Sequence, residues 1–371
     1  MKIRSKFIFF NWIILMVLIL SPYCTPIEVT LVWKKELKHR VEYSDLAEGS
    51  GDVIFVHGDI VDNQITLIDK EGDIRWQWGP DLKLGVLGVS ISNDGRYFVY
   101  WTDIVHESDM PRKSFIHYRD RDKGELWKKE LYGSPHISPD GKYIFVAPGW
   151  ENWKSFFMDS KGNILWEKKY GSTTGFFSPD GNIIWDGFDY YDKNGKIALE
   201  INLPGRPTSF AENLAYIACA KTTSGADVKP EISAAVRKVI AKYHGFVADR
   251  KGNIILEGRA MVSENGKIAI IYGYEKTKIY KLPEKSLINE YPVKKYRIIE
   301  YSDISYDGNI IVILGERTDI KSNNNLFIVD LSRNEFFEGK VEKLGIIYLT
   351  NDGKNFLIKS DKKLYFYEIS N

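Results

Sequence analysis

A short motif that recurs along the chain constrains the fold more than any other feature. It reads Ser-x-Asp/Asn-Gly (Thr once) followed by alternating apolar residues, and clear copies begin at residues 92, 138, 178, 263, 305 and 350. Two weaker copies surround Gly51 and Asn213, and most successive copies lie 40 to 46 residues apart. Repeats of this period are typical of small supersecondary units that bury their apolar faces against their neighbours.

A second motif sits inside most of the repeats. An apolar strand end is followed by Asp, one or two polar residues, Gly, and a further strand that ends in Trp or Leu, at residues 67–76, 118–127, 157–166, 190–199 and 247–256. Gly supplies a positive φ and Asp bonds within its own turn, so each copy predicts a β-hairpin. Trp76, Trp127 and Trp166 recur at one position of this hairpin, where we expect them to pack between neighbouring sheets.

The two motifs order a four-stranded sheet, since the first joins strands one and two and the second joins strands three and four. Repeats of about 40–50 residues with four strands are typical of propeller blades. The N-terminal VWKKEL matches the fourth-strand segments at 126–131 and 165–170, whereas the chain ends after the third-strand-like LYFYEI. We therefore predict an all-β fold: one β-propeller over residues 29–371, with eight four-stranded blades (seven as an alternative), closed by the N-terminal strand.

These motifs resemble those of known families. The SPDG turns are similar to WD-repeat and TolB-like propellers, and the Asp-x-x-Gly-x-x-x-Trp element resembles quinoprotein-like (pyrroloquinoline-quinone-type) repeats. The quinoprotein resemblance implies an adjacent cysteine pair beside the cofactor and Thr before the turn Gly. This chain has no such pair and carries Glu71, Lys161 and Asn194 at the Thr position. We therefore expect no bound cofactor. Exported scaffold lipoproteins of outer-membrane assembly are similar in blade type.

The N-terminus is predicted to be a signal peptide over residues 1–23. Lys2, Arg4 and Lys6 precede a segment, 7–20, that is apolar except for one Asn, and Ser-Pro follows it. This is the order of regions in an export signal, and the apolar run is shorter than the roughly 20 residues of a membrane span. A signal anchor is the alternative. Cys24 follows directly, so it is a candidate lipidation site, although the large Tyr23 before it departs from the lipoprotein pattern.

Composition excludes several classes of function. The chain has 51 Lys and Arg against 50 Asp and Glu, so no excess of positive charge favours nucleic-acid binding. Two cysteines cannot supply a thiolate metal site, and no His-x-x-x-His spacing is present, so no metal site is expected. No nucleophile elbow or phosphate loop is present either.

The longest irregular segments all fall between strands two and three of a blade. They include residues 101–114, 148–155, 219–245 and 315–325, and the insertion at 221–245 contains a predicted short helix near 230–243. In a propeller these connections open on the face opposite the tight turns, so they should gather on one rim. Binding residues tend to lie in such insertions. The candidate binding residues on this rim are Trp150, Trp153, Asp103, His106 and His244.

Two functions remain open on this evidence. The first is an exported, non-catalytic platform that binds a protein partner in a bacterial cell envelope, periplasmic or membrane-anchored through its N-terminus. The second is a hydrolase or lyase, or a binder of a small ligand, with its site at the mouth of the channel. The enzyme would require Asp103, His106, Glu151, His244 or Glu316 to converge near the axis. The absence of a recognisable catalytic set favours the platform.

Overall fold

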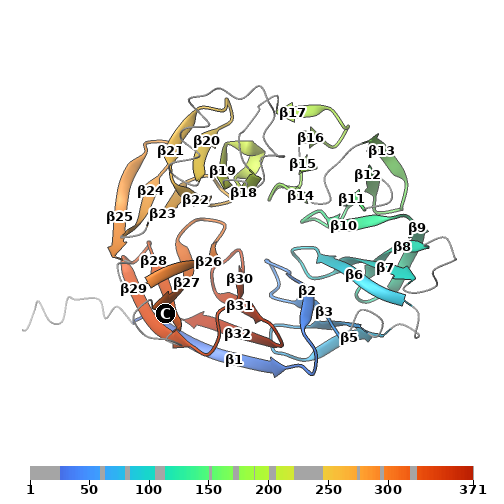
Figure 1. The fold of residues 1–371 in the computed structure, drawn as a ribbon, viewed down its shortest axis with the longest axis horizontal. Coiled ribbons are helices and arrows are strands. Elements are labelled where there is room, and N and C mark those ends of the chain that lie inside the picture. The colour runs from blue at the N-terminus through green and yellow to red at the C-terminus, as the bar shows by residue number, and fades with distance from the viewer. Residues whose placement is uncertain are drawn as a thin grey trace, which may run out of the picture.

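The computed structural model describes residues 26–58, 63–79, 84–104, 113–149, 153–169, 175–187, 189–199, 206–220, 245–273, 276–292, 296–317 and 324–370. These residues form eight antiparallel sheets of four strands each, arranged in a ring (Figure 1). The predicted eight-bladed propeller is therefore confirmed. The predicted signal peptide, Cys24 and the predicted helix near 230–243 lie outside the described residues.

Each blade runs from its inner strand at the channel to its outer strand at the rim. Blades 1 to 4 are β2 (Val41–Leu46), β3 (Val53–His57), β4 (Gln64–Ile68) and β5 (Ile74–Trp78); β6 (Leu84–Ile91), β7 (Tyr97–Ile104), β8 (Ser114–Asp120) and β9 (Gly124–Glu130); β10 (Gly133–Ile137), β11 (Tyr143–Pro148), β12 (Lys154–Asp159) and β13 (Ile164–Lys169); and β14 (Phe176–Phe177), β15 (Ile183–Trp185), β16 (Tyr190–Asp192) and β17 (Ile197–Leu199).

Blades 5 to 8 complete the ring. They are β18 (Arg206–Phe210), β19 (Tyr216–Ala220), β20 (Gly245–Asp249) and β21 (Ile254–Glu257); β22 (Arg259–Val262), β23 (Ile268–Tyr272), β24 (Lys276–Lys281) and β25 (Ser286–Pro292); β26 (Tyr296–Ile304), β27 (Ile310–Arg317), β28 (Asn324–Asp330) and β29 (Glu335–Val341); and β30 (Ile346–Leu349), β31 (Asn355–Ser360), β32 (Lys363–Ser370) and β1 (Glu28–Glu36).

The N-terminal strand closes the ring, as the sequence predicts. β1 pairs antiparallel with β32, from Glu28 opposite Ser370 to Glu36 opposite Lys363. The pairing gives the last blade its outer strand from the other end of the chain, which leaves no blade incomplete.

The apolar core is divided among the blade interfaces. Every interface between neighbouring blades has its own cluster of buried residues within the described part of the chain. Between blades 1 and 2, for example, Val56 and Leu67 pack with Phe98 and Tyr100. The cluster between blades 3 and 4 is the smallest, with Phe145, Ala147, Phe157 and Ile184. Because each blade buries apolar residues on both faces, no blade is a folding unit by itself.

Tryptophans of the outer strands bind the next blade. The indole N–H of Trp127 in blade 2 donates to the carbonyl of Ser160 in blade 3 (3.0 Å), and Trp166 donates likewise to Lys193 in blade 4 (3.2 Å). Trp33 of the closing strand makes the same bond to Lys70 (3.0 Å). A Cβ at Gly195 would lie 2.9 Å from the Trp166 ring, which explains why the hairpin turn requires Gly there. The expected packing of these tryptophans between blades is confirmed.

The connections divide between the two faces of the ring. The turns between strands one and two and between strands three and four form one face, which we call the turn face. The connections between strands two and three, and those between blades, form the other, which we call the loop face. At Asn213 the first turn is replaced by η1 (Glu212–Leu214), the one helix among the described residues. No helix in the described part of the chain is long and apolar enough to cross a membrane.

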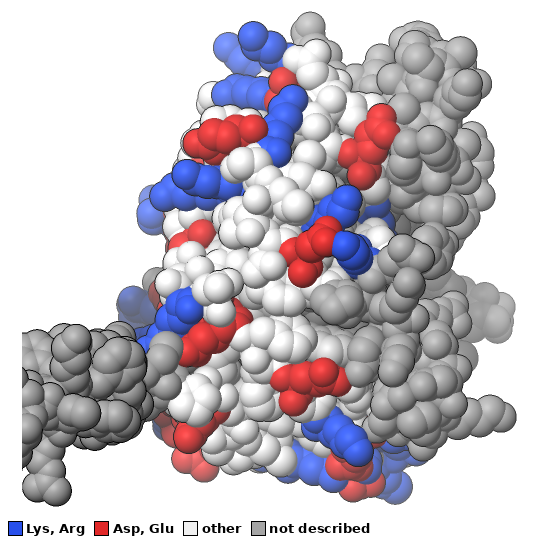
Figure 2. All heavy atoms as spheres, turned by 90° about the vertical axis from the view of Figure 1, so that its left-hand side faces the viewer, with Lys and Arg blue, Asp and Glu red and all other residues white. Residues whose placement is uncertain are grey.

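The outer wall of the ring carries charge of both signs. Seen from the side of β25 and β29, Lys and Arg side chains are interspersed with Asp and Glu, and no large area of a single sign is present in this view (Figure 2). An electrostatic binding surface for nucleic acid or a charged membrane is therefore not visible on this side of the molecule.

Candidate functional site

The turn face is a ring of hydrogen bonds between neighbouring blades. At six of the eight blade interfaces, the turn that follows the inner strand binds the equivalent turn of the neighbouring blade through the backbone. The bonds are Asn351 N–H to Glu48 O (2.8 Å), Gly49 to Asn93 (2.8 Å), Asn93 to Pro139 (2.9 Å), Glu212 to Glu264 (2.7 Å), Asn265 to Tyr306 (3.1 Å) and Tyr306 to Asn351 (3.1 Å). This bonding fixes the backbone around the mouth of the channel.

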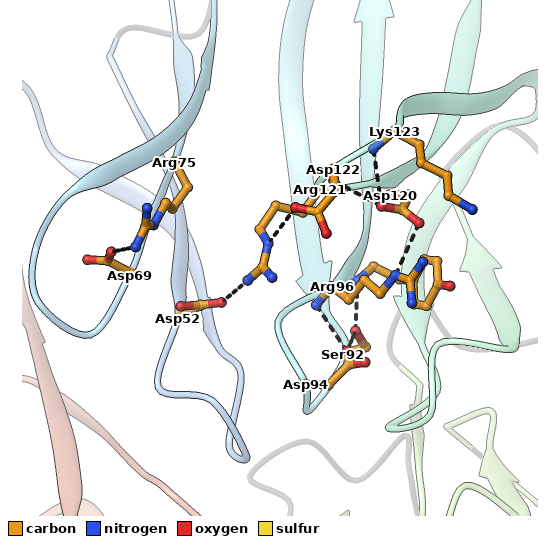
Figure 3. Close-up of polar contacts among 11 residues, drawn as sticks. Asp52, Asp69, Arg75, Ser92, Asp94, Arg96, Asp120, Arg121, Asp122 and Lys123 are labelled. Atoms are coloured by element: carbon orange, nitrogen blue, oxygen red, sulfur yellow. Dashed lines mark hydrogen bonds and ion pairs between the residues drawn. The ribbon is translucent and has the colours of Figure 1, made fainter.

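Charged groups reinforce the same face between blades 1 and 2 (Figure 3). Arg121, in the outer hairpin of blade 2, pairs with the buried carboxylate of Asp52 in blade 1 (2.8 Å). Arg96 pairs with Asp120 (3.2 Å), which also accepts the N–H groups of Asp122 and Lys123. Desolvation opposes ionisation of Asp120, but these bonds outweigh it and lower its pKa. The acidic groups of this hairpin are therefore structural.

Within this ring lies a hollow at the end of the channel. Two cavities, of about 240 and about 270 Å³, share the residues Glu48, Phe176, Phe177, Pro179 and Glu264 and so form one continuous space. Their walls come from the last residues of the inner strands and the first residues of the turns that follow, in all eight blades. The hollow therefore opens toward the turn face, away from the long insertions.

One side of the hollow is acidic. Asp45 of β2 and Asp303 of β26 occupy equivalent positions, one residue before the end of the inner strand. Asp45 accepts the N–H of Ile91 (3.0 Å) and the hydroxyl of Ser90 (3.1 Å), and Asp303 accepts the N–H of Leu349 (2.8 Å). Both side chains thus tie their blade to the next. Burial raises the pKa of each carboxyl to about 6.

Glu48 and Glu264 stand at the rim of the same side. Each is held through its backbone carbonyl by the neighbouring turn, whereas neither carboxylate has a hydrogen bond or ion pair with a described residue. Burial and the nearby carboxylates, among them Asp303, raise the pKa of Glu264 to about 7 and that of Glu48 well above its ordinary value. Among the described residues that line the hollow, none is Lys or Arg.

The other side of the hollow is aromatic and apolar. Phe176 stacks on Phe210 with ring centroids 5.0 Å apart, and Phe177, Pro139 and Pro179 continue the wall. His136 of β10 lines the first cavity, and its Nε2 is buried without a hydrogen-bond partner among the described residues. Burial lowers the pKa of His136 to about 4, so its ring is neutral at pH 7.

The two predicted binding candidates that the structure describes, Trp153 and Asp103, do not line the hollow. Trp153 directly precedes β12 on the loop face and is 52% exposed, so a large apolar ring faces solvent there. Asp103 lies in β7 rather than in a loop and is buried, at 6% exposure. Trp150, His106 and His244, and Glu151 of the enzyme alternative, lie outside the described residues, so their roles stay predictions. Within the described part of the chain, no group of three or more His, Cys, Asp or Glu could hold a metal ion.

The acidic and aromatic mouth of the channel was not among the sites predicted from the sequence. The signal was present in the repeat itself, because the variable residue of the turn lines the hollow in six of the eight blades: Glu48, Asn93, Pro139, Pro179, Glu264 and Asn351. Two of the eight turns that ring the mouth carry Glu there, at 48 and 264, and a third carries Glu212, which accepts the hydroxyl of Tyr306 (2.8 Å). Comparing the variable position across repeats would have identified the site.

Comparisons with known proteins add little beyond the fold. Neither protein-family models nor curated proteins match this sequence. Among solved structures, a chain of the crystal structure of the mitotic checkpoint complex is similar over 92% of this chain and 96% of that chain, with 9% sequence identity and a TM-score of 0.49. A likeness at this level carries no argument about function. The specific resemblance to quinoprotein-like and TolB-like families stays a prediction.

Proposed function

We propose that this chain is an exported β-propeller that acts as a protein-binding platform in a bacterial cell envelope, and that the partner is held on the loop face. The observation that carries the proposal is the unequal distribution of connections. Inner hairpins on the turn face are short and alike, as between β10 and β11, where Ile137 and Tyr143 are the flanking residues. Between strands two and three, by contrast, β7 ends at Ile104 before β8 begins at Ser114, and β19 ends at Ala220 before β20 begins at Gly245.

The exposed ring of Trp153 also supports partner binding on the loop face. An exposed Trp is costly in water and is enriched in the residues that dominate binding energy at protein interfaces. It stands at the start of β12, on the loop face, where the second-to-third connection of blade 3 returns to the sheet. A partner that covers this ring would remove its apolar surface from water.

The experiment is capture of partners from an envelope extract. The mature chain is compared with a version in which residues 221–244 are replaced by a short Gly-Ser turn, a change that leaves β19 and β20 intact. The proposal predicts that a partner recovered by the first is lost or strongly reduced with the second. As a matched control, Lys161→Ser alters the exposed hairpin between β12 and β13, strands three and four of blade 3, on the turn face. Equal recovery from all three chains would contradict the proposal.

Export is tested separately. Mass spectrometry of the protein isolated from cells is expected to show that residues 1–23 have been removed and, in the lipoprotein form, that Cys24 carries a diacylglyceryl group. A chain that retains Met1 and is recovered only from the cytoplasm would contradict export, while leaving partner binding on the loop face to be judged by capture.

A further inference from the structure

We infer that the hollow at the turn face binds a small organic cation, an ammonium or guanidinium group attached to an apolar body. The site is independent of the proposed partner binding, because it lies at the opposite end of the channel. It is formed by the acidic side with Glu48 and Glu264, the aromatic side with Phe176, and the unpartnered Nε2 of His136.

The acidic side of the hollow favours a cation, because a bound positive charge stabilises the ionised form of carboxyl groups buried together. Four carboxylates, Asp45, Glu48, Glu264 and Asp303, line one continuous hollow whose described lining includes no Lys or Arg. Asp45 and Asp303 are engaged by backbone N–H groups, but Glu48 and Glu264 have no such partner among the described residues. Glu212 provides the contrast. It occupies the equivalent turn position, lies outside both cavities, and is bound by the Tyr306 hydroxyl.

His136 is a second, independent indication of a ligand. Its ring belongs to the other side of the hollow, and its Nε2 is buried without a partner in the described structure. An unpaired buried nitrogen is costly, and a ligand N–H group would satisfy it when the ring is neutral. The low pKa of His136 is consistent with that neutral form.

The aromatic side selects against a bare metal ion. The stacked rings of Phe176 and Phe210, with Phe177 beside them, offer apolar surface and π faces that favour an organic cation. A divalent metal prefers several oxygen ligands at about 2.0–2.6 Å. No three acidic or His side chains among the described residues are close enough together to supply such a set.

The test is calorimetric titration of the full mature chain with matched probes. 2-Phenylethylammonium carries the charge and the apolar body, and 2-phenylethanol has the same shape without the charge. We expect binding of the amine and at least about tenfold weaker binding of the alcohol. Nα-acetyl-lysine methylamide presents an ammonium group on a peptide-like backbone. Comparing its binding with that of 2-phenylethylammonium shows whether the hollow prefers a free amine or the Lys side chain of a peptide. Binding of neither cation, or equal binding of amine and alcohol, would overturn the inference.

Variants locate the site. Glu48→Gln and Glu264→Gln should each weaken binding of the amine about tenfold or more, whereas Glu212→Gln, which removes the same charge from an equivalent turn, should leave it within about twofold. Thermal melting checks that each variant is folded. If a Gln variant does not fold, the comparison of amine with alcohol on the unmodified chain still decides the matter. Tight binding of Ca²⁺ that displaces the amine would assign the carboxylates to a metal and overturn the inference.

Discussion

The turn face and the loop face of this propeller are built from the same eight blades but follow different rules. On the turn face, short hairpins of similar length bind one another through backbone hydrogen bonds at six of the eight blade interfaces, and buried Ser or Thr hydroxyls hold six of the eight inner hairpins. On the loop face, the connections between strands differ in length from blade to blade. The difference teaches that the turn face maintains the ring, so that variation is tolerated at the other face. The acidic hollow is the exception. It lies within the turn face, but the residues that line it differ from blade to blade.

The largest expected effect is on stability and comes from the turn face. A Cβ at Gly141 would lie 2.5 Å from the ring of Tyr97, and Gly141 has a φ of +73°. Gly141→Ala is therefore expected to lower the free energy of unfolding by about 3 kcal/mol, since both strain and overlap oppose it. Urea denaturation measures the change. A loss below about 0.5 kcal/mol, which is the size expected for an ordinary surface substitution, would show that the turn is not a rigid part of the ring.

Two buried Ser residues of blade 3 sharpen the comparison. The hydroxyl of Ser138, on the turn face, donates to Asp140 (2.7 Å) and accepts the N–H of Tyr143 (3.0 Å). The hydroxyl of Ser155, near the loop face, is equally buried but has no hydrogen-bond partner among the described residues. Ser138→Ala should cost about 1–2 kcal/mol, whereas Ser155→Ala should be neutral or slightly stabilising. Denaturant midpoints test the pair, and equal losses would contradict the assigned roles.

The hollow should make stability depend on pH. The pKa of Glu264 is raised to about 7 in the folded chain, above the value of about 4.3 in an unfolded one. Between these values the folded chain binds more protons, so this group lowers the free energy of unfolding as pH rises from about 4 to about 7. The free energy of unfolding of Glu264→Gln should therefore equal that of the unmodified chain near pH 4 and exceed it by about 1 kcal/mol at pH 8. Melting curves at pH 4 and pH 8 measure the difference in stability. A variant that is more stable than the unmodified chain only at pH 4 would contradict the predicted pH dependence.

The smallest expected effect on stability is at the loop face. Trp153→Ser removes a ring that is 52% exposed, so the free energy of unfolding should change by no more than about 0.5 kcal/mol. Capture of the partner should nevertheless fall, because the ring is proposed to be covered in the complex. A variant that unfolds more easily yet binds its partner normally would assign Trp153 to packing instead.

The ring was predictable because its signals are local. Gly with positive φ, Asp within its own turn and alternating apolar residues recur in each repeat, and the match of VWKKEL to the outer strands identified the closing strand. The mouth was not predictable in the same way. The position that holds Asp45 is occupied in the other blades by Ser90, His136, Phe176, Ser209, Met261, Asp303 and Tyr348. Its character comes from side chains far apart in sequence that meet only when the ring closes.

The most direct test of the division between faces is site-specific photo-cross-linking in cells. A benzoylphenylalanine is placed at Trp153 on the loop face or at Tyr306 on the turn face, because both positions carry an exposed aromatic ring. The account predicts a cross-linked partner from position 153 and none from position 306. A partner captured from position 306 alone would contradict it.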